Sequence, residues 1–464
     1  MKKNKYYKLL SNISIYLSIA IIIFTSELNN LDELWNFSNA INFANGLIPY
    51  KEFNMITTPL YAIINGIILK IFGKHLYIYR ISYILLYIFL THILSKILKK
   101  INIPDLKRQI FLIITIYLLL IFTYSDYNFF NLILLLLIIN LEIKKEKTVK
   151  ENILIGTLLG LSTLTKQTTG IITSAASIMT LILYKIIYKE KIYNQIKGRI
   201  IGMITILTIF YIYLLTNHIT NDFIDLTILG LKGFNSKLSN KCLIILIISI
   251  LYIISIIIKE YKHKNKINYI NIILIVYSSF YLIINYPILD PIHLIISLIP
   301  CSILFIYNHK FKLKVQKELI LLGIIITINI INIKSTQIYI KSPKLNEYNV
   351  YKFIRLNIGN KRNIINVSEF VKKQDKETYI LDNSSIAYML PLNNYHHYFD
   401  IPLAGNVGTH GETIMLNKIK EKDCILLIKD RQNLEKSFPT LYKYIMENYQ
   451  ITETENSFGI YKKL

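Results

Sequence analysis

Long stretches of nearly uncharged, apolar residues recur along this chain, and they constrain its fold more than any other feature. Examples are Ile110 to Tyr124 and Leu243 to Ile258. As helices, stretches of about 16 to 20 residues cross a hydrocarbon layer of about 30 Å. Only 18% of the 464 residues are charged, whereas soluble domains usually have about 25%. The chain is therefore predicted to be a polytopic membrane protein.

Clusters of Lys and Arg lie between the apolar stretches, and they orient the chain. The formal charge of +24 is weak evidence for a nucleic-acid partner, because Lys, Ile, Asn and Tyr are all abundant, as AT-rich codon usage would produce. We expect a lipid bilayer as partner and no nucleic acid. Short loops rich in Lys and Arg stay on the cytoplasmic side of a membrane. Six clusters are expected there: residues 2–8, 96–108, 144–150, 185–199, 259–266 and 310–317.

The connectors with few cations are expected outside, and the alternation predicts about eleven spans. It holds only if Pro59 to Phe72, which is too short to span comfortably, lies along or dips into the outer interface. The amino terminus is then cytoplasmic and the carboxyl terminus external. The predicted spans are residues 7–26, 76–95, 109–124, 128–143, 152–165, 169–187, 200–216, 241–258, 267–285, 291–308 and 318–333.

The composition changes after residue 333, where charges, turns and shorter apolar runs appear together. Thr378 to Leu381 and Cys424 to Ile428 are predicted as buried strands, and a last strand is expected near Phe458 to Tyr461. Helices are expected at Ile414 to Lys422 and at Phe438 to Asn448. The expected fold is mainly α: a transmembrane helix bundle at residues 1–333, followed by a small external α/β domain at residues 334–464.

The first external loop, residues 29–75, is the longest connector before the terminal domain, and long ordered loops tend to be functional. Apolar residues at helical spacing predict an amphipathic surface helix from Leu31 to Asn45. Asp32 and Glu33 open it. One interpretation is structural, with Asn30 as the N-cap and Glu33 three positions later. The other is that a carboxylate at the bilayer surface serves as general base on an acceptor hydroxyl. The two interpretations are compatible.

This loop resembles the start of the C-type membrane glycosyltransferases, relatives of the protein O-mannosyltransferases and the aminoarabinose transferases. The resemblance rests on DELWNFSNAINFANGLIPY, then KEFNMITTPLYAIINGIILKIFG, then Arg80. It implies that Asp32, the acid after the first span, is catalytic. Two prolines normally precede the interfacial helix in that family, and here Thr58 replaces the first and Pro59 remains. The turn after the surface helix also fits the family pattern, at Gly46, Pro49, Tyr50 and Glu52.

Two cations are candidates to hold a phosphate leaving group. Lys166 lies in GTLLGLSTLTKQTTG, which is similar to the fifth span of bacterial family members. A fixed cation there would stabilise the charge that develops on a departing polyprenyl phosphate. Snorkelling of Lys166 to the interface is the structural alternative. Arg80, about one turn inside the second span, can bind phosphate oxygens with its forked guanidinium.

Glu33, Asp126, Asp290 and His293 are further candidates for substrate binding. Asp290 precedes Pro291, so the pair is also typical of an ordinary helix start, and Asp126 could simply cap the next span. The run YPILDPIH, which contains Asp290 and His293, is similar to an external turn in some bacterial family members. An Asp-x-x-His pair is a weak metal signal, and the first loop has no Asp-x-Asp. No metal and no cofactor are expected.

The resemblance implies an inverting glycosyltransferase of the plasma membrane. Its partners would be a polyprenyl-phosphate-linked sugar donor and a glycan, lipid or protein acceptor of the cell envelope. A transporter or flippase is the main alternative, but it should carry ionisable residues deep within spans, and the span centres here are nearly uncharged. A membrane scaffold would tolerate Asp32→Asn. An O-antigen-type polymerase or ligase would normally have its large external loop late in the chain.

Overall fold

The computed structural model describes residues 2–28, 30–123, 125–189, 191–233, 237–262, 268–309, 317–382, 399, 401–455 and 458–464. These residues form two compact units. We call one the helical unit; it comprises Met1–Phe24, Ile81–Tyr211 and Asn235–Ile338. The other, the loop-and-sheet unit, comprises Thr25–Arg80, Ile212–Phe234 and Tyr339–Leu464. The described part of the loop at residues 29–75 therefore belongs to the same unit as Tyr339–Leu464.

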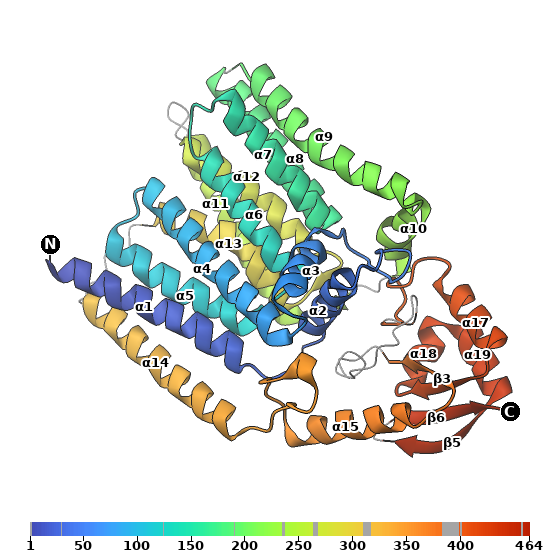
Figure 1. Cartoon of the computed structure of the whole chain (residues 1–464). Helices are drawn as coiled ribbons and strands as arrows, with labels where there is room; N and C mark the ends of the chain where they lie inside the picture. The colour runs from blue at the N-terminus through green and yellow to red at the C-terminus, as the bar shows by residue number, and fades with distance from the viewer. Residues whose placement is uncertain are drawn as a thin grey trace. The chain divides into compact units, whose positions relative to one another are not determined.

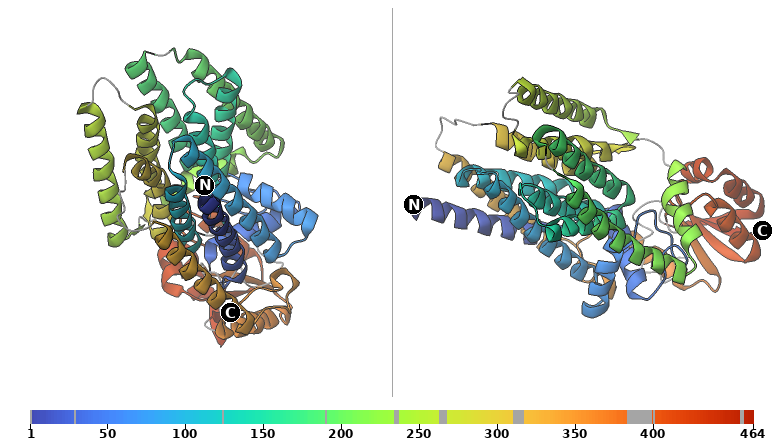
Figure 2. Two further views of the ribbon diagram at one scale, coloured as in Figure 1. Left: turned by 90° about the vertical axis from the view of Figure 1, so that its left-hand side faces the viewer. Right: turned by 90° about the horizontal axis from the view of Figure 1, so that it is seen from above.

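Long apolar helices build the helical unit, and they lie alongside one another in all three views (Figures 1 and 2). Each predicted span overlaps one of them. They are α1 (Lys2–Thr25), α4 (Leu76–Lys100), α5 (Asp105–Phe122), α6 (Tyr127–Glu142), α7 (Val149–Thr165), α8 (Gln167–Tyr188), α9 (Tyr193–Thr216), α11 (Asn240–Lys262), α12 (Tyr269–Tyr281, continued by a 3-10 turn, Leu282–Asn285), α13 (Pro291–Asn308) and α14 (Lys317–Lys341). Within the described ranges, 6 helices are long and apolar enough to cross a membrane by length and composition: α4, α8, α9, α11, α13 and most of α14.

Glycines bring α7 and α9 into close contact. A Cβ atom added at Gly156 would lie 2.0 Å from the Arg199 carbonyl oxygen, and one added at Gly202 would lie 2.1 Å from that of Ile153. Buried Leu, Ile and Tyr side chains from many helices fill the rest of the bundle. Two-residue strands β1 (Lys237–Leu238) and β2 (Ile288–Leu289) pair in parallel in this unit. α14 continues to Lys341, through the boundary expected between residues 333 and 334.

Two short helices of the loop at residues 29–75 pack on each other. α2 (Leu31–Ala44) and α3 (Leu60–Phe72) meet at Gly66, where an added Cβ atom would lie 2.9 Å from the Phe43 Cβ atom. α3 has 13 residues, which is fewer than the roughly 20 that a span needs. Its length agrees with the expectation that this segment does not cross, and its place at the outer interface stays a prediction.

The terminal part contains a four-stranded sheet of order β3-β4-β6-β5. β3 (Glu377–Leu381) and β4 (Cys424–Ile428) are parallel, and β6 (Phe458–Lys463) runs antiparallel to both β4 and β5 (Tyr449–Glu455). Helices α15 (Ile358–Lys372), α17 (Gly411–Glu421), α18 (Arg431–Ser437) and α19 (Pro439–Asn448) complete it. The predicted strands and helices are present. β5 was not predicted, because its polar edge sequence lacks a buried apolar run.

Segments far apart in sequence hold the loop-and-sheet unit together. After α9 come α10 (Thr220–Ile224), a π-helical turn (Asp225–Leu229) and a 3-10 turn (Gly230–Gly233). The Thr409 backbone N–H donates to both Asp225 carboxylate oxygens, at 3.0 and 3.1 Å. Asn54 of the first loop donates to the Asn406 carbonyl oxygen at 3.1 Å. A further 3-10 turn (Asn349–Tyr351) precedes α15. The first loop, the segment after α9 and the terminal domain therefore form one body.

Candidate active site

Asp32 and Glu33 lie next to each other at the start of α2, but their carboxylates have different surroundings. Asn30 is the N-cap, and its side chain accepts a hydrogen bond from the Glu33 backbone N–H at 2.9 Å, as expected for a cap. The Glu33 side chain does not complete a capping box. Its two carboxylate oxygens instead accept hydrogen bonds from Arg80, at the start of α4.

Glu33 and Arg80 form a buried, bidentate ion pair. The Arg80 Nε and Nη2 atoms lie 2.8 Å from the two carboxylate oxygens, and Nη1 donates to the Ser26 carbonyl oxygen at 2.8 Å. Arg80 is 0% exposed and Glu33 is 5% exposed. Paired, fork-shaped geometry of this kind is the strong form of a charge-assisted hydrogen bond. The pair holds α2 against the ends of α1 and α4 that belong to the same unit.

Asp32 is partly exposed, in contrast to Glu33. Successive residues of a helix point about 100° apart, so the two carboxylates occupy different faces of α2. The Asp32 carbonyl oxygen accepts a hydrogen bond from the Asn36 side chain at 2.8 Å, inside the helix. Of the two acids, Asp32 is the one that the Arg80 pair leaves accessible to solvent.

The family-like turn after α2 is tightly built. Gly46 has a φ of +85°, a backbone conformation that glycine adopts without strain. Glu52 accepts a hydrogen bond from the Ile48 backbone N–H at 2.6 Å. The buried Tyr50 hydroxyl donates to the Thr57 carbonyl oxygen at 2.8 Å. These contacts give the turn residues a structural role in shaping the loop that carries Asp32.

Four of the predicted residues lie in the helical unit together with Asn128. We call these five residues the bundle-end cluster: Asp126, Asn128, Lys166, Asp290 and His293. Asp126 caps α6 by accepting the Phe129 backbone N–H at 2.8 Å, and it also accepts the Asn128 amide at 3.0 Å. The Asn128 amide oxygen accepts from the Lys166 ammonium at 2.8 Å. One asparagine thus connects the acid to the cation.

The start of α13 brings Asp290 and His293 to the same cluster. Asp290 is the N-cap with Pro291 at the first helical position, and its Oδ1 atom lies 2.9 Å from both the His293 backbone nitrogen and its Nδ1 atom. Burial raises the pKa of the Asp126 carboxyl, while His293 and Lys166 act electrostatically in the opposite direction. The cap interpretation of both aspartates is confirmed, and it leaves their side chains within a charged cluster.

Asn128 was not predicted as a site residue. In the sequence it is only the first residue of the predicted span 128–143. An amide just after an aspartate cap, where a span begins, is the signal that would have found it. The aromatic ring of Tyr127 adds to the cluster, because the Lys166 ammonium lies 5.3 Å from its centroid, within the range of a cation–π contact.

Within the described ranges, no group of three or more His, Cys, Asp and Glu side chains could hold a metal ion. The predicted residues therefore form two constellations, each inside one unit. Asp32, Glu33 and Arg80 belong to the loop-and-sheet unit, and Asp126, Lys166, Asp290 and His293 belong to the helical unit.

Comparison with known proteins identifies the fold. No family model matches the chain, and no curated protein matches it. Among solved structures, the chain is similar to ArnT from Cupriavidus metallidurans bound to undecaprenyl phosphate, with a TM-score of 0.59 and 9% identity over 98% of this chain and 97% of that chain. The apo state of the same protein gives a TM-score of 0.58 and 10% identity over 97% of this chain and 98% of that one. This chain therefore shares the fold of ArnT.

Proposed function

We propose that this protein is an integral-membrane glycosyltransferase that takes a sugar from a polyprenyl-phosphate carrier and passes it to an acceptor. The observation that carries the proposal is the fold match, which covers nearly the whole of both chains, to a protein crystallised with undecaprenyl phosphate. A partly exposed acid at the start of α2, where the resemblance places the catalytic residue, supports it. The acceptor would be a glycan, lipid or protein of the cell envelope.

Asp32 would act as the general base. Its carboxylate would take the proton from an acceptor hydroxyl or amine as that group attacks the anomeric carbon. The bond between this carbon and the phosphate oxygen would break, and the electron pair would leave with the polyprenyl phosphate. Attack opposite the leaving group inverts the anomeric carbon. Glu33 cannot easily share this role, because its carboxylate is buried on Arg80.

Lys166 would stabilise the negative charge that develops on the leaving phosphate. Its hydrogen bond to Asn128 and its position over the Tyr127 ring hold the ammonium in one place, as electrostatic preorganisation requires. Asp126, Asp290 and His293 would bind sugar hydroxyls or the acceptor around it. The contact of Arg80 with phosphate stays a prediction, and its hydrogen bonds to Glu33 and Ser26 favour a positioning role.

The test is transfer in isolated membranes supplied with a panel of radiolabelled polyprenyl-phosphate sugars. Wild type should transfer one of them, and Asp32→Asn should lower the rate by about 10²- to 10⁴-fold. Asp423→Asn, which removes a half-exposed carboxylate from the terminal domain, is the matched control and should leave the rate unchanged. Transfer that persists in Asp32→Asn would refute the assigned base. Absence of transfer from every donor would favour a transporter or flippase.

A further inference from the structure

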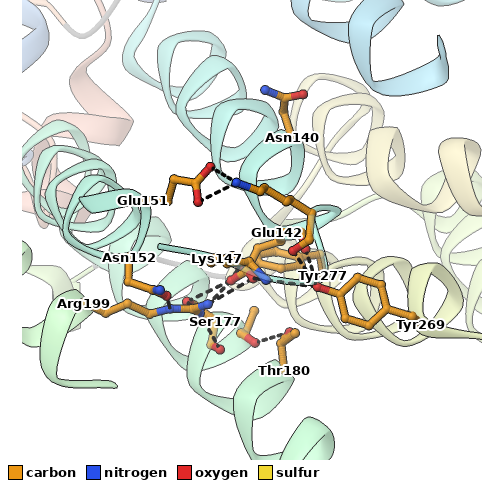
Figure 3. Close-up of polar contacts among 12 residues, drawn as sticks. Asn140, Glu142, Lys147, Glu151, Asn152, Ser177, Thr180, Arg199, Tyr269 and Tyr277 are labelled. Atoms are coloured by element: carbon orange, nitrogen blue, oxygen red, sulfur yellow. Dashed lines mark hydrogen bonds and ion pairs between the residues drawn. The ribbon is translucent and has the colours of Figure 1, made fainter. Parts of the chain in front are cut away.

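A second charged cluster lies at the opposite end of α6 from Asp126, and the proposed reaction does not use it. Figure 3 shows Glu142, the last residue of α6, facing Lys147 and Arg199. The Arg199 Nη1 atom lies 2.6 Å from Glu142 Oε1, and the Lys147 Nζ atom lies 3.2 Å from Oε2. The side chains are all buried: Glu142 is 0% exposed, Lys147 is 1% exposed and Arg199 is 5% exposed. We call these three residues the ionic lock.

Neutral groups from neighbouring helices complete the ionic lock. The Tyr277 hydroxyl of α12 donates to Glu142 Oε1 at 3.3 Å, and Arg199 of α9 donates to the Ser177 carbonyl oxygen of α8 at 3.1 Å. Tyr269 of α12 donates its hydroxyl to the Glu142 carbonyl oxygen at 2.8 Å. Asn152 of α7 accepts from Arg199 Nε at 3.4 Å. Glu142 thus contacts α9 and α12 directly, and Arg199 extends the network to α7 and α8.

The ionic lock contains one anion and two cations, so substitutions of its three members should differ in their effect. One buried anion faces two buried cations. Removing Glu142 leaves two cations without a counter-ion, which is strongly unfavourable in a low-dielectric interior. Removing Arg199 or Lys147 leaves one neutral pair. The order of effect expected from charge alone is therefore Glu142 first, with the two cations well behind.

α6 connects the ionic lock to the bundle-end cluster as a rigid rod. It has 16 residues, which corresponds to a length of about 24 Å. In its second turn, the Asn131 side chain accepts a hydrogen bond from Ser162 of α7 at 2.7 Å. At its first turn, Asn128 accepts from Lys166, which directly follows α7. A slip of one residue between α6 and α7 would shift them by about 1.5 Å and turn the facing side chains by about 100°, so both contacts would be lost.

We propose that Glu142, Lys147 and Arg199 are positioning residues that fix the register of α6 against α7, and thereby hold Asn128 on Lys166 at the other end of the bundle. The consequence for transfer rests on the proposed function. The register itself does not, so the two are tested separately.

The register is tested by disulfide cross-linking in nanodiscs. Asn131→Cys and Ser162→Cys are introduced together after Cys242, Cys301 and Cys424 are replaced by Ala. We expect rapid oxidation in this background, a rate lower by about tenfold with Glu142→Gln, and a smaller loss, about two- to threefold, with Arg199→Gln. Glu146→Gln, an exposed acid of the same connector, is the matched control and should have no effect. Should Glu142→Gln prevent folding, Arg199→Gln decides alone.

An unchanged cross-linking rate in a folded Glu142→Gln or Arg199→Gln variant would overturn the proposal and leave the ionic lock with a purely stabilising role. Transfer provides the second measurement. We expect Glu142→Gln to lower transfer, and the oxidised cysteine pair in the same variant to restore it, because the disulfide replaces the lost register contact. A loss that the disulfide does not rescue would also contradict positioning. If Asp32→Asn kept full transfer, the assignment of Asp32 as the general base would be wrong, but the cross-linking result would still hold.

Discussion

At the scale of single residues, Asp32 and Glu33 show how neighbours of the same chemistry separate into different roles. The difference lies in their partners. Glu33 has the buried guanidinium of Arg80, and Asp32 keeps part of its surface in solvent. A carboxylate that must accept a proton from a substrate has to be reachable, while a carboxylate that neutralises a buried cation has to be enclosed.

We predict that stability and activity respond oppositely to substitution of these two acids. Glu33→Gln leaves Arg80 buried without its counter-ion, and we expect a loss of about 3–5 kcal/mol in the free energy of unfolding. Asp32→Asn should change it by less than about 0.5 kcal/mol, as is usual for a partly exposed side chain. Thermal unfolding in detergent measures the stability of both variants, and the transfer assay measures their activity. Equal destabilisation by the two variants would contradict this division.

The pH dependence of stability should include a contribution from Asp290. Its pKa lies below the ordinary value of 3.8: burial alone would raise it, but the hydrogen bond and charge of His293 outweigh burial. A lowered pKa in the folded state means that the carboxylate stabilises the fold above about pH 3.8, and that this stabilisation is lost as the pH falls through the folded-state pKa.

Asp290→Asn removes the charge of the carboxylate but keeps the helix cap, because Asn is as good an N-cap as Asp. We expect the variant to melt below wild type at pH 7, and the two melting temperatures to converge as the pH falls below about 3.8. Melting curves across this pH range provide the measurement. A difference that stays constant with pH would show that the Asp290 charge contributes nothing.

At the scale of elements, the contact between α2 and α3 determines how firmly the loop with Asp32 is held. Gly66 is the point of closest approach. We predict that Gly66→Ala destabilises the protein by about 1–3 kcal/mol, because the added methyl group overlaps the Phe43 side chain and the Ala40 carbonyl oxygen. The measurement is the melting temperature of the purified protein.

Gly323→Ala in α14 is the matched control for Gly66→Ala. A Cβ atom at Gly323 would meet nothing within 4 Å, and alanine is favoured over glycine in a helix by up to about 1 kcal/mol. We expect this variant to be neutral or slightly more stable. Similar destabilisation at both positions would mean that loss of glycine, rather than the contact between α2 and α3, is responsible.

At the scale of the whole molecule, the distribution of cations predicts which parts face the outside. We expect a single cysteine at Lys436, an exposed position of the terminal domain, to react with an impermeant maleimide in intact cells. A cysteine at Glu146, exposed in the connector between α6 and α7, should react only after permeabilisation. Both are placed in a cysteine-free background. Reversed labelling would invert the topology and move Asp32 to the cytoplasmic side.

Much of the fold was determined locally, by patterns readable in the sequence. Apolar stretches of sufficient length become helices because a buried backbone must satisfy its own hydrogen bonds, and each predicted span overlaps a helix. Short buried runs likewise predicted β3, β4 and β6. β5 was not predicted, because this edge strand depends on its pairing with β6. The side chains of β5 are largely exposed, so they form no buried apolar run.

Tertiary structure alone decided which charged residues meet when they lie far apart in the sequence. Arg80 reaches Glu33 across 47 positions, and Arg199 reaches Glu142 across 57. No local pattern encodes such pairs, because each depends on how separate helices pack and on the need to neutralise charges that packing has buried. The sequence by itself therefore determined the helices and the candidate acid. The packing decided that Asp32 stays accessible while Glu33 is enclosed, and that Asn128 connects Asp126 to Lys166.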